Sequence, residues 1–308
     1  MKTGTARLIL CLALLPAALA AVQPASASQL VARDSTDASL EVNDKGMALV
    51  TYEDKTGVHR LLAWAAVNEQ LEFNLDYSGG WGVFRRKLWK SFNDACSRYD
   101  GPSLNWVVEA CKAPDGSYWA LQSWQRSLPI FGGEPRTWIQ KSWDLRLSHW
   151  TGDVPKLEVW QDWKYSLRLG NLFARYTYRG APVFGFRATR QGNPLDALGR
   201  NVYFDSYNSW YGSGWRRTNG LLTHNPSGVV CEAFAGPDFM PGNPLVNHGR
   251  GERYRATVAG PGVAPDAYWE GEALPAFDPA NPEHVRHEDA MNALMASLGD
   301  SDPRCTEQ

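Results

Sequence analysis

The stretch WDLRLSHWTGDVPKLEVWQDW, residues 143–163, decides the fold class. Its first half alternates apolar and polar residues, so Leu145 and Leu147 would point to one face of a strand and their neighbours to the other. The second half repeats this alternation around Leu157 and Val159, and TGDVP between the halves has the composition of a turn. We therefore expect two antiparallel strands joined as a hairpin, with one apolar face and one charged face.

Segments of the same kind occur on both sides of this hairpin. They are short, rich in β-branched and aromatic residues, and separated by turns that contain Gly, Pro, Asn or Asp. They cover residues 39–43, 47–53, 58–66, 117–125, 172–178, 182–189, 201–207, 221–224 and 229–234. This spacing predicts a mainly β protein, an antiparallel β-sandwich or open barrel, and leaves open whether there is one β domain or two.

Three parts of the chain depart from the strand pattern. Residues 85–96 and 103–111 have a helical period and predict a short helical insertion near 85–112. The Gly/Pro-rich residues 236–281 predict an extended wrapping segment, so a β-rich domain would cover 28–235 and the wrapping segment with a C-terminal helix would cover 236–308. That helix is expected over 282–298, and its buried stripe would be Val285, Met291, Leu294, Met295 and Leu298.

The first 27 residues have the features of an export signal. Lys2 and Arg7 form a basic start, residues 8–22 form a short apolar run, and the small residues 25–27 suit cleavage. No later segment is apolar enough to predict a membrane span. We therefore expect a secreted, extracellular protein without a transmembrane segment. The formal net charge of −2 disfavours nucleic acid as a partner.

The cysteines agree with export to an oxidising compartment. Removal of the signal takes away Cys11 and leaves four cysteines, which allow three pairings. We favour Cys96–Cys111, which closes a short loop, and Cys231–Cys305, which would tie the tail to the body. The spacings are wide and lack a CxxC, so neither a metal site nor a cofactor is expected.

Three phrases carry a resemblance to other proteins. They are SLNWVVEACKAPDGSYWALQSWQR, LRLSHWTGDVPKLEVW and RYTYRGAPVFG, all within residues 70–235. They resemble a group of uncharacterised exported proteins of high-GC soil actinobacteria. The resemblance implies export and one shared fold, and it transfers no catalytic residue.

The charged face of the 143–163 hairpin is a candidate site for acid catalysis. Glu158 and Asp162 are four residues apart, roughly 13 Å along a strand, which is too far for a glycosidase pair. One register of the hairpin would place Asp144 opposite Asp162 and form a carboxylate pair. The other would place Arg146 opposite Glu158 and form an ion pair, with Trp160 at the centre of the strip in either case.

Other catalytic or metal-binding patterns are weak. The sequence has no GxSxG, HExxH or EF-hand motif. His149 ends a predicted strand, but the sequence identifies no serine or cysteine partner for it. His284 and His287 lie three apart on the C-terminal helix, where a solvated helical face is favoured over a metal pair.

The stretch DSYNSWYGSGWRR, residues 205–217, is the best candidate for ligand contact. In the strand before it, alternation places Tyr203, Asp205 and Tyr207 on one face. Glycines at 212 and 214 are expected to break the strand, so that Trp210, Tyr211 and Trp215 would stand on a loop. We expect Trp215 to be structural and Trp210 to be an exposed ligand contact.

These observations favour an exported, disulfide-stapled protein that binds a polysaccharide or cell-wall glycan without catalysis, because exposed rings stack on sugars. One alternative is a carbohydrate-active hydrolase or lyase, and another is a structural or interaction module of the cell envelope. The candidate ligand-binding residues are Trp160, Arg146, Glu158, Tyr203, Asp205, Tyr207, Trp210 and Tyr211. The candidate acids of an enzyme are Glu158, Asp162, Asp144 and Asp205.

Overall fold

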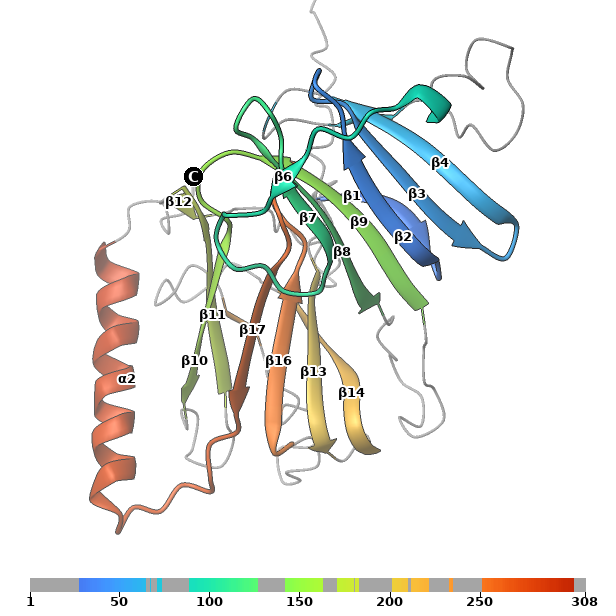
Figure 1. The fold of residues 1–308 in the computed structure, drawn as a ribbon. Helices are drawn as coiled ribbons and strands as arrows, with labels where there is room; N and C mark the ends of the chain where they lie inside the picture. The colour runs from blue at the N-terminus through green and yellow to red at the C-terminus, as the bar shows by residue number, and fades with distance from the viewer. Residues whose placement is uncertain are drawn as a thin grey trace, which may run out of the picture.

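The described part of the protein is mainly antiparallel β-structure with a long helix near the C-terminus (Figure 1). This confirms the predicted fold class, a mainly β protein with the antiparallel sheets of a β-sandwich or open barrel and a C-terminal helix. The computed structural model describes residues 28–64, 67, 71–73, 89–126, 142–162, 171–179, 181–182, 201–209, 212–221, 233–234 and 251–301.

A first pair of sheets encloses the larger core. One sheet has the order β2-β3-β4-β5 and the other has the order β1-β9-β8-β7-β6. Their strands are β1 Gln29–Arg33, β2 Thr36–Val42, β3 Ala48–Asp54, β4 Gly57–Trp64, β5 Glu72–Phe73, β6 Ser97–Arg98, β7 Val107–Lys112, β8 Tyr118–Arg126 and β9 Ser142–Trp150. Alternate residues of the strands fill the space between the sheets. Among them are four fully buried side chains, those of Val42, Val50, Trp119 and Leu147. Burial of these side chains is the main force that holds the two sheets together.

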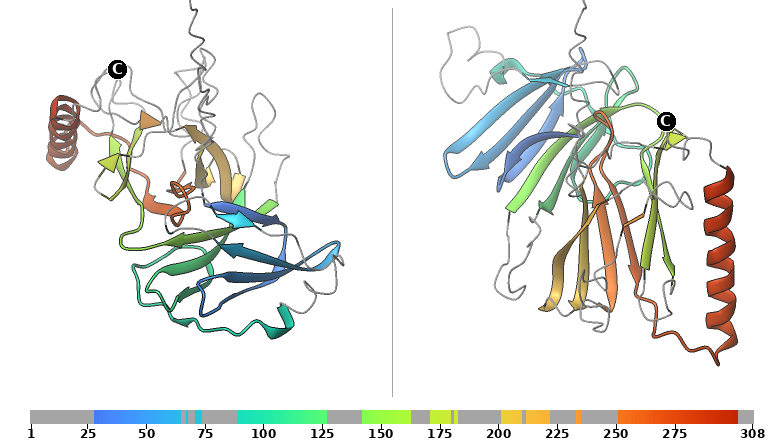
Figure 2. Two further views of the ribbon diagram at one scale, coloured as in Figure 1. Left: turned by 90° about the horizontal axis from the view of Figure 1, so that it is seen from above. Right: turned by 180° about the vertical axis from the view of Figure 1, so that it is seen from behind.

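A second pair of sheets lies beside the first (Figures 1 and 2). One sheet has the order β14-β13-β16-β17, and the other has the order β10-β11-β12 with β15 also paired to β11. Their strands are β10 Lys156–Asp162, β11 Asn171–Tyr178, β12 Ala181–Pro182, β13 Asn201–Ser209, β14 Gly212–Leu221, β15 Ala233–Phe234, β16 Arg253–Val258 and β17 Ala267–Glu272. A smaller core forms where Leu157 and Tyr176 pack against Tyr254, Ala256 and Val258.

A buried polar network joins the two pairs of sheets. The carboxylate of Asp266, which is 0% exposed, accepts hydrogen bonds from the Ser28 hydroxyl, the Gly260 amide at 2.9 Å and the Trp124 indole at 2.5 Å. The Gln122 side chain completes the junction through the Asp266 amide at 2.8 Å. Because a buried carboxylate is costly without partners, this junction fixes how the chain before β17 lies against β8.

Helix α2, Pro282–Ser301, confirms the predicted C-terminal helix and lies alongside β10 (Figure 1). Among the described side chains of the helix, that of Met291 is buried, at 7% exposure. Val285, which was expected in the buried stripe, is instead 37% exposed. The side chains of Leu294, Met295 and Leu298 lie outside the described part of the structure.

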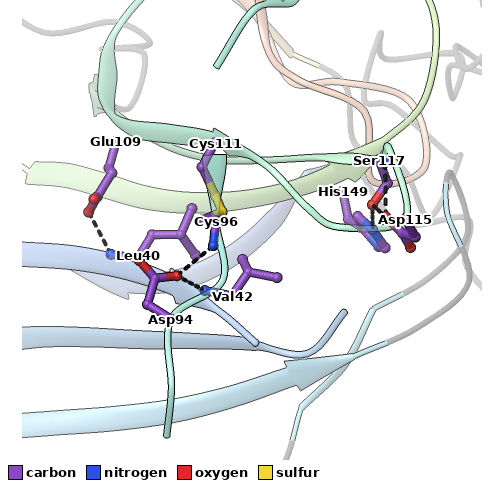
Figure 3. The surroundings of a disulfide bond; sticks show 9 residues. All are labelled: Leu40, Val42, Asp94, Cys96, Glu109, Cys111, Asp115, Ser117 and His149. Atoms are coloured by element: carbon purple, nitrogen blue, oxygen red, sulfur yellow. Dashed lines mark hydrogen bonds between the residues drawn. A yellow bond between two sulfur atoms is a disulfide. The ribbon is translucent and has the colours of Figure 1, made fainter. Parts of the chain in front are cut away.

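The predicted disulfide Cys96–Cys111 is present, with a Cα–Cα distance of 5.7 Å. It holds the segment before β6 against β7, and that segment protects the edge of β2 (Figure 3). The Val42 amide donates to the Asp94 carboxylate at 3.0 Å, and the Leu40 amide donates to Glu109 at 2.6 Å. These carboxylates satisfy backbone donors that an edge strand would otherwise expose. The predicted Cys231–Cys305 pair lies outside the described residues.

The predicted 143–163 hairpin is wrong, although both of its strands exist. Strand β9 is paired on one side with β1 and on the other with β8, so it has no free edge for β10. Residues 151–155 instead carry the chain into the other pair of sheets, where β10 pairs with β11. Neither of the two registers considered for the hairpin therefore occurs.

Two further sequence assignments change. Residues 107–112 form strand β7 rather than part of a helix, because pairing with β8 outweighs the helical spacing of the apolar residues. Only a single turn of 3₁₀ helix, Trp89–Ser91, represents the helical insertion among its described residues. The Gly/Pro-rich segment contains two strands, β16 and β17, although residues 259–266 between them do wrap along the sheet junction.

Candidate functional site

The candidate acids are spread over three sheets. Asp144 lies on β9, Glu158 and Asp162 lie on β10, and Asp205 lies on β13. The pair of Asp144 with Asp162 that a hairpin would have made is absent, because those two strands are not paired. Glu158 is exposed on its strand, and its cross-strand neighbour on β11 is Arg175.

The polar face predicted for β9 is buried rather than open. Asp144 is 2% exposed, and its carboxylate lies 3.3 Å from Arg146 and 3.4 Å from Arg33. The Arg146 side chain also donates to the Ser28 hydroxyl at 2.9 Å and stacks over the ring of Trp124. Arg146 is therefore a structural residue of the sheet junction. Trp160, the other predicted member of this strip, is partly buried on β10 in a different sheet.

The sheet β14-β13-β16-β17 brings other predicted residues together on one face. Cross-strand pairing places Tyr207 opposite both Trp215 and Arg253, and places Asp205 opposite Arg255. Side chains of directly paired residues point to the same side of a sheet. We call this surface the aromatic–arginine face, made of Tyr203, Asp205, Tyr207, Trp215, Arg253, Arg255, Tyr268 and Glu270.

Arginine side chains stack on Trp215 of this face and on Trp106 at its edge. The Arg255 guanidinium lies 4.4 Å from the centroid of the Trp215 ring and 5.3 Å from that of Trp106. It also donates to the Asp205 carboxylate at 2.7 Å, and the Asp205 side chain is only 4% exposed. Arg253 lies over Trp215 at 5.7 Å. Stacking and ion pairing together hold the Trp215 and Trp106 rings in one orientation.

Exposure increases along the aromatic–arginine face. At one end Tyr203 packs against the buried Trp124, with ring centroids 4.8 Å apart. At the other end the Arg253 side chain is 46% exposed and forms an ion pair with Glu270. Tyr207 and Trp215 are partly exposed near that end, with ring centroids 5.2 Å apart. The open end is therefore the part of the face that a ligand can reach.

Trp106 has an unusual backbone conformation at the edge of the same face. Its φ is 60°, in the left-handed region that a bulky residue rarely adopts, and a β-bulge follows between Val107 and Glu109. The Trp106 ring meets Tyr268 edge-on at 5.0 Å, while its buried indole N–H has no hydrogen-bond partner among the described residues. Strain and an unsatisfied donor each cost about 1–3 kcal/mol, and such costs are concentrated at functional sites.

Tyr268 extends the face to a small cavity. Burial raises the pKa of Tyr268, while the nearby guanidinium groups of Arg255 and Arg253 oppose that rise. Its phenol therefore stays protonated at neutral pH and donates to Glu270. Behind the ring lies a cavity of about 240 Å³ lined by residues 103–105, 154–157 and 266–268.

The structure contains a buried contact between a serine and a histidine (Figure 3). The sequence did not predict it. The Ser117 hydroxyl donates to Asp115 at 2.6 Å and lies 2.9 Å from His149 Nε2. Because the serine proton is directed to Asp115, the imidazole donates from Nε2, and its Nδ1 has no hydrogen-bond partner in the described structure. Ser117 is 1% exposed, so no substrate reaches it. The contact fastens the turn before β8 to the end of β9.

The His149 ring is stacked on Trp119, with ring centroids 3.8 Å apart. Burial lowers the pKa of His149 to about 4, and the Asp115 carboxylate only partly opposes this shift. The imidazole is therefore neutral at physiological pH. A buried neutral histidine of this kind is a packing residue that becomes unfavourable when acid protonates it.

The two histidines of α2 bind backbone groups. His284 Nδ1 accepts a hydrogen bond from the Asp278 amide at 3.0 Å, and His287 Nε2 lies 3.0 Å from the carbonyl oxygen of Gln161. Among the described residues, no group of three His, Cys, Asp or Glu side chains has the geometry to hold a metal ion. In the same part of the chain, no helix is long and apolar enough to cross a lipid bilayer.

The hairpin formed by β13 and β14 changes the interpretation of residues 205–217. Gly212 and Gly214 belong to a strand, because a bulge after Tyr207 accommodates them and the Gly214 amide donates to the Asn208 side chain at 2.8 Å. Trp215 is thus on a strand and not on a loop. Trp210 and Tyr211 lie outside the described residues.

Models of known protein families, curated proteins and solved structures were each compared with the chain, and none matches it.

Proposed function

We propose that this is an exported, non-catalytic protein that binds a polysaccharide or cell-envelope glycan at the open end of the aromatic–arginine face. The observation that supports this proposal is the grouping of Tyr207, Trp215 and Tyr268 on one sheet face, each partly exposed, beside two arginine–carboxylate pairs. Sugars present apolar C–H faces and hydroxyl groups, so their sites combine rings with fixed polar groups.

Preorganisation strengthens this argument. The Asp205–Arg255 pair is nearly buried and the Arg253–Glu270 pair is partly exposed, so the polar groups beside the rings are already oriented. Binding then immobilises few side chains, which lowers its entropic cost. The two pairs are each neutral overall, which suits a ligand recognised mainly by shape and hydrogen bonds.

Affinity gel electrophoresis of the purified chain against a panel of soluble polysaccharides tests the proposal. We expect at least one polysaccharide to retard the protein. Tyr207→Ala and Arg253→Ala should weaken that binding about tenfold, the usual effect of removing a contact that contributes more than about 1 kcal/mol.

Matched controls come from the first pair of sheets. Trp143 on β9 is 43% exposed and Arg98 on β6 is exposed, and neither belongs to the aromatic–arginine face. Trp143→Ala and Arg98→Ala should leave retardation unchanged. Equal losses in the controls, or no retardation by any polysaccharide, would show that the proposed function is wrong.

A further inference from the structure

The cavity behind Tyr268 is formed where three separate parts of the chain meet. Residues 103–105 precede Trp106, residues 154–157 lead into β10, and residues 266–268 lead into β17. Its volume of about 240 Å³ is below the roughly 300–1,000 Å³ of typical small-molecule sites. A single sugar unit fits such a space, whereas a longer oligosaccharide would have to extend out of it.

The charge of the cavity is set by one residue. Lys156 is its basic lining residue, is exposed, and has no ion-pair partner in the described structure. The acidic lining residue, Asp266, has a fully buried carboxylate that is already bonded to Ser28, Gly260 and Trp124. The cavity therefore presents one positive charge that no carboxylate of the described residues neutralises.

The remaining polar lining groups suit sugar hydroxyls. Ser103 and Asn105 are exposed residues that carry a hydroxyl and an amide side chain. Tyr268 supplies a ring that also belongs to the aromatic–arginine face, and Trp106 is fixed edge-on against that ring. A chain lying on the face could thus place one of its units in the cavity.

We infer that this cavity is a subsite for a carboxylate-bearing sugar, such as a uronic acid unit of a polysaccharide. The inference rests on the proposed function and specifies its ligand class. Lys156 would pair with the carboxylate, Ser103 and Asn105 would bond hydroxyl groups, and Tyr268 would line the ring of the sugar. One cation among neutral donors balances a single negative charge, which fits a carboxylate better than a more highly charged group.

Two forms of one polymer test the inference directly. Polygalacturonate carries free carboxylates, and its fully methyl-esterified form has the same backbone with those charges masked. Isothermal titration at low salt should show that the wild-type chain binds the free acid at least tenfold more tightly than the ester, with alginate as a second polyuronate. Lys156→Gln should lower affinity for the free acid to that for the ester and leave ester binding unchanged.

The control variant is Lys45→Gln, which makes the same charge change at an exposed lysine in the turn between β2 and β3. It should retain the preference for the free acid. If Lys156→Gln retains that preference, or if the wild-type chain binds acid and ester equally, the carboxylate subsite is wrong while the glycan-binding function stands. Monomeric galacturonate that binds as tightly as the polymer would also overturn a subsite within a polysaccharide groove.

Failure of the proposed function gives a different result. In that case the wild-type chain binds neither the acid, nor the ester, nor any neutral polysaccharide of the panel, and both proposals are then wrong.

Discussion

Replacement of His149 by phenylalanine should flatten the dependence of stability on pH in mild acid. The wild-type imidazole is 2% exposed, and burial lowers its pKa to about 4 from an ordinary value of 6.5. Between these values the unfolded chain binds a proton that the folded chain does not bind. Stability must therefore fall as the pH falls through this window, and no further effect of this group is expected well below pH 4.

The magnitude follows from the two pKa values. Linkage gives a loss of about 2 kcal/mol in the free energy of unfolding between pH 7 and pH 5, and about 3 kcal/mol by pH 4. His149→Phe keeps a flat ring on Trp119 and does not titrate. The substitution loses the hydrogen bond to Ser117, which destabilises the fold, and removes the buried Nδ1 that lacks a partner in the described structure, which stabilises it. At pH 7 these two effects on the free energy of unfolding offset each other to within about 1 kcal/mol.

Urea denaturation of both proteins at pH 7 and pH 5, followed by circular dichroism, measures this difference. Other titrating groups act alike in the two proteins, so the change in stability of wild type minus that of His149→Phe isolates the histidine. We expect a difference of about 2 kcal/mol. Equal acid-induced losses in the two proteins would refute the assignment of His149 as a buried neutral group.

Three other results are expected. Replacing Cys96 and Cys111 with alanine should destabilise the chain by roughly 3 kcal/mol, the chain-entropy value for a loop of 15 residues, in thermal melts without reductant; an unchanged melting temperature would contradict this. Asp266→Ala should cost about 3–5 kcal/mol in urea denaturation, because it leaves the buried Trp124 indole and the Gly260 amide without their acceptor, and a loss below 1 kcal/mol would show that the junction is not required. Trp215→Ala should lower the melting temperature by several degrees, from roughly 3 kcal/mol of lost packing, whereas Trp210→Ala should leave melting unchanged and weaken polysaccharide binding; equal destabilisation by both would oppose the assignment of Trp210 as a ligand contact.

Local patterns in the sequence predicted the strands well. The alternation in 39–43, 47–53 and 58–66 predicted the β2-β3-β4 meander, which the structure confirms. The same period placed Tyr203, Asp205 and Tyr207 on one face of a strand, and their cross-strand pairings agree. These successes have one cause, because a half-buried strand leaves its period of two in the chain whatever its partner is.

The alternation of apolar and polar residues does not indicate which strand will pair with which. Strands β9 and β10 are consecutive and both amphipathic, which suggested a hairpin, but β9 had its two edges occupied by β1 and β8. β1 lies more than a hundred residues earlier in the chain, so no local signal reports that it takes this edge. The carboxylate pair built on the hairpin was wrong for the same reason.

Half of the aromatic–arginine face was not predicted, because its strands β16 and β17 lie in a segment rich in proline and glycine. Arg253 and Arg255 lie on β16, within the segment interpreted as extended wrapping. Their strand, RYRATV, does alternate, with Tyr254, Ala256 and Val258 buried against the smaller core. That period was a usable signal, and it would have placed two arginines on the face opposite the core. Trp106 left no such signal, since its conformation depends on the bulge in β7.

The arrangement of the arginines decides how the aromatic–arginine face can meet a ligand. Arg255 stacks on both Trp215 and Trp106, so ring surface that would otherwise be open to a sugar is already covered by the protein. The stack is anchored by the nearly buried Asp205, and a ligand would have to break that ion pair to displace it. Trp215 therefore serves mainly to hold the face rigid. Ligand contact is expected instead at Tyr207 and Arg253 at the open end, because those side chains retain solvent-exposed surface that binding can cover.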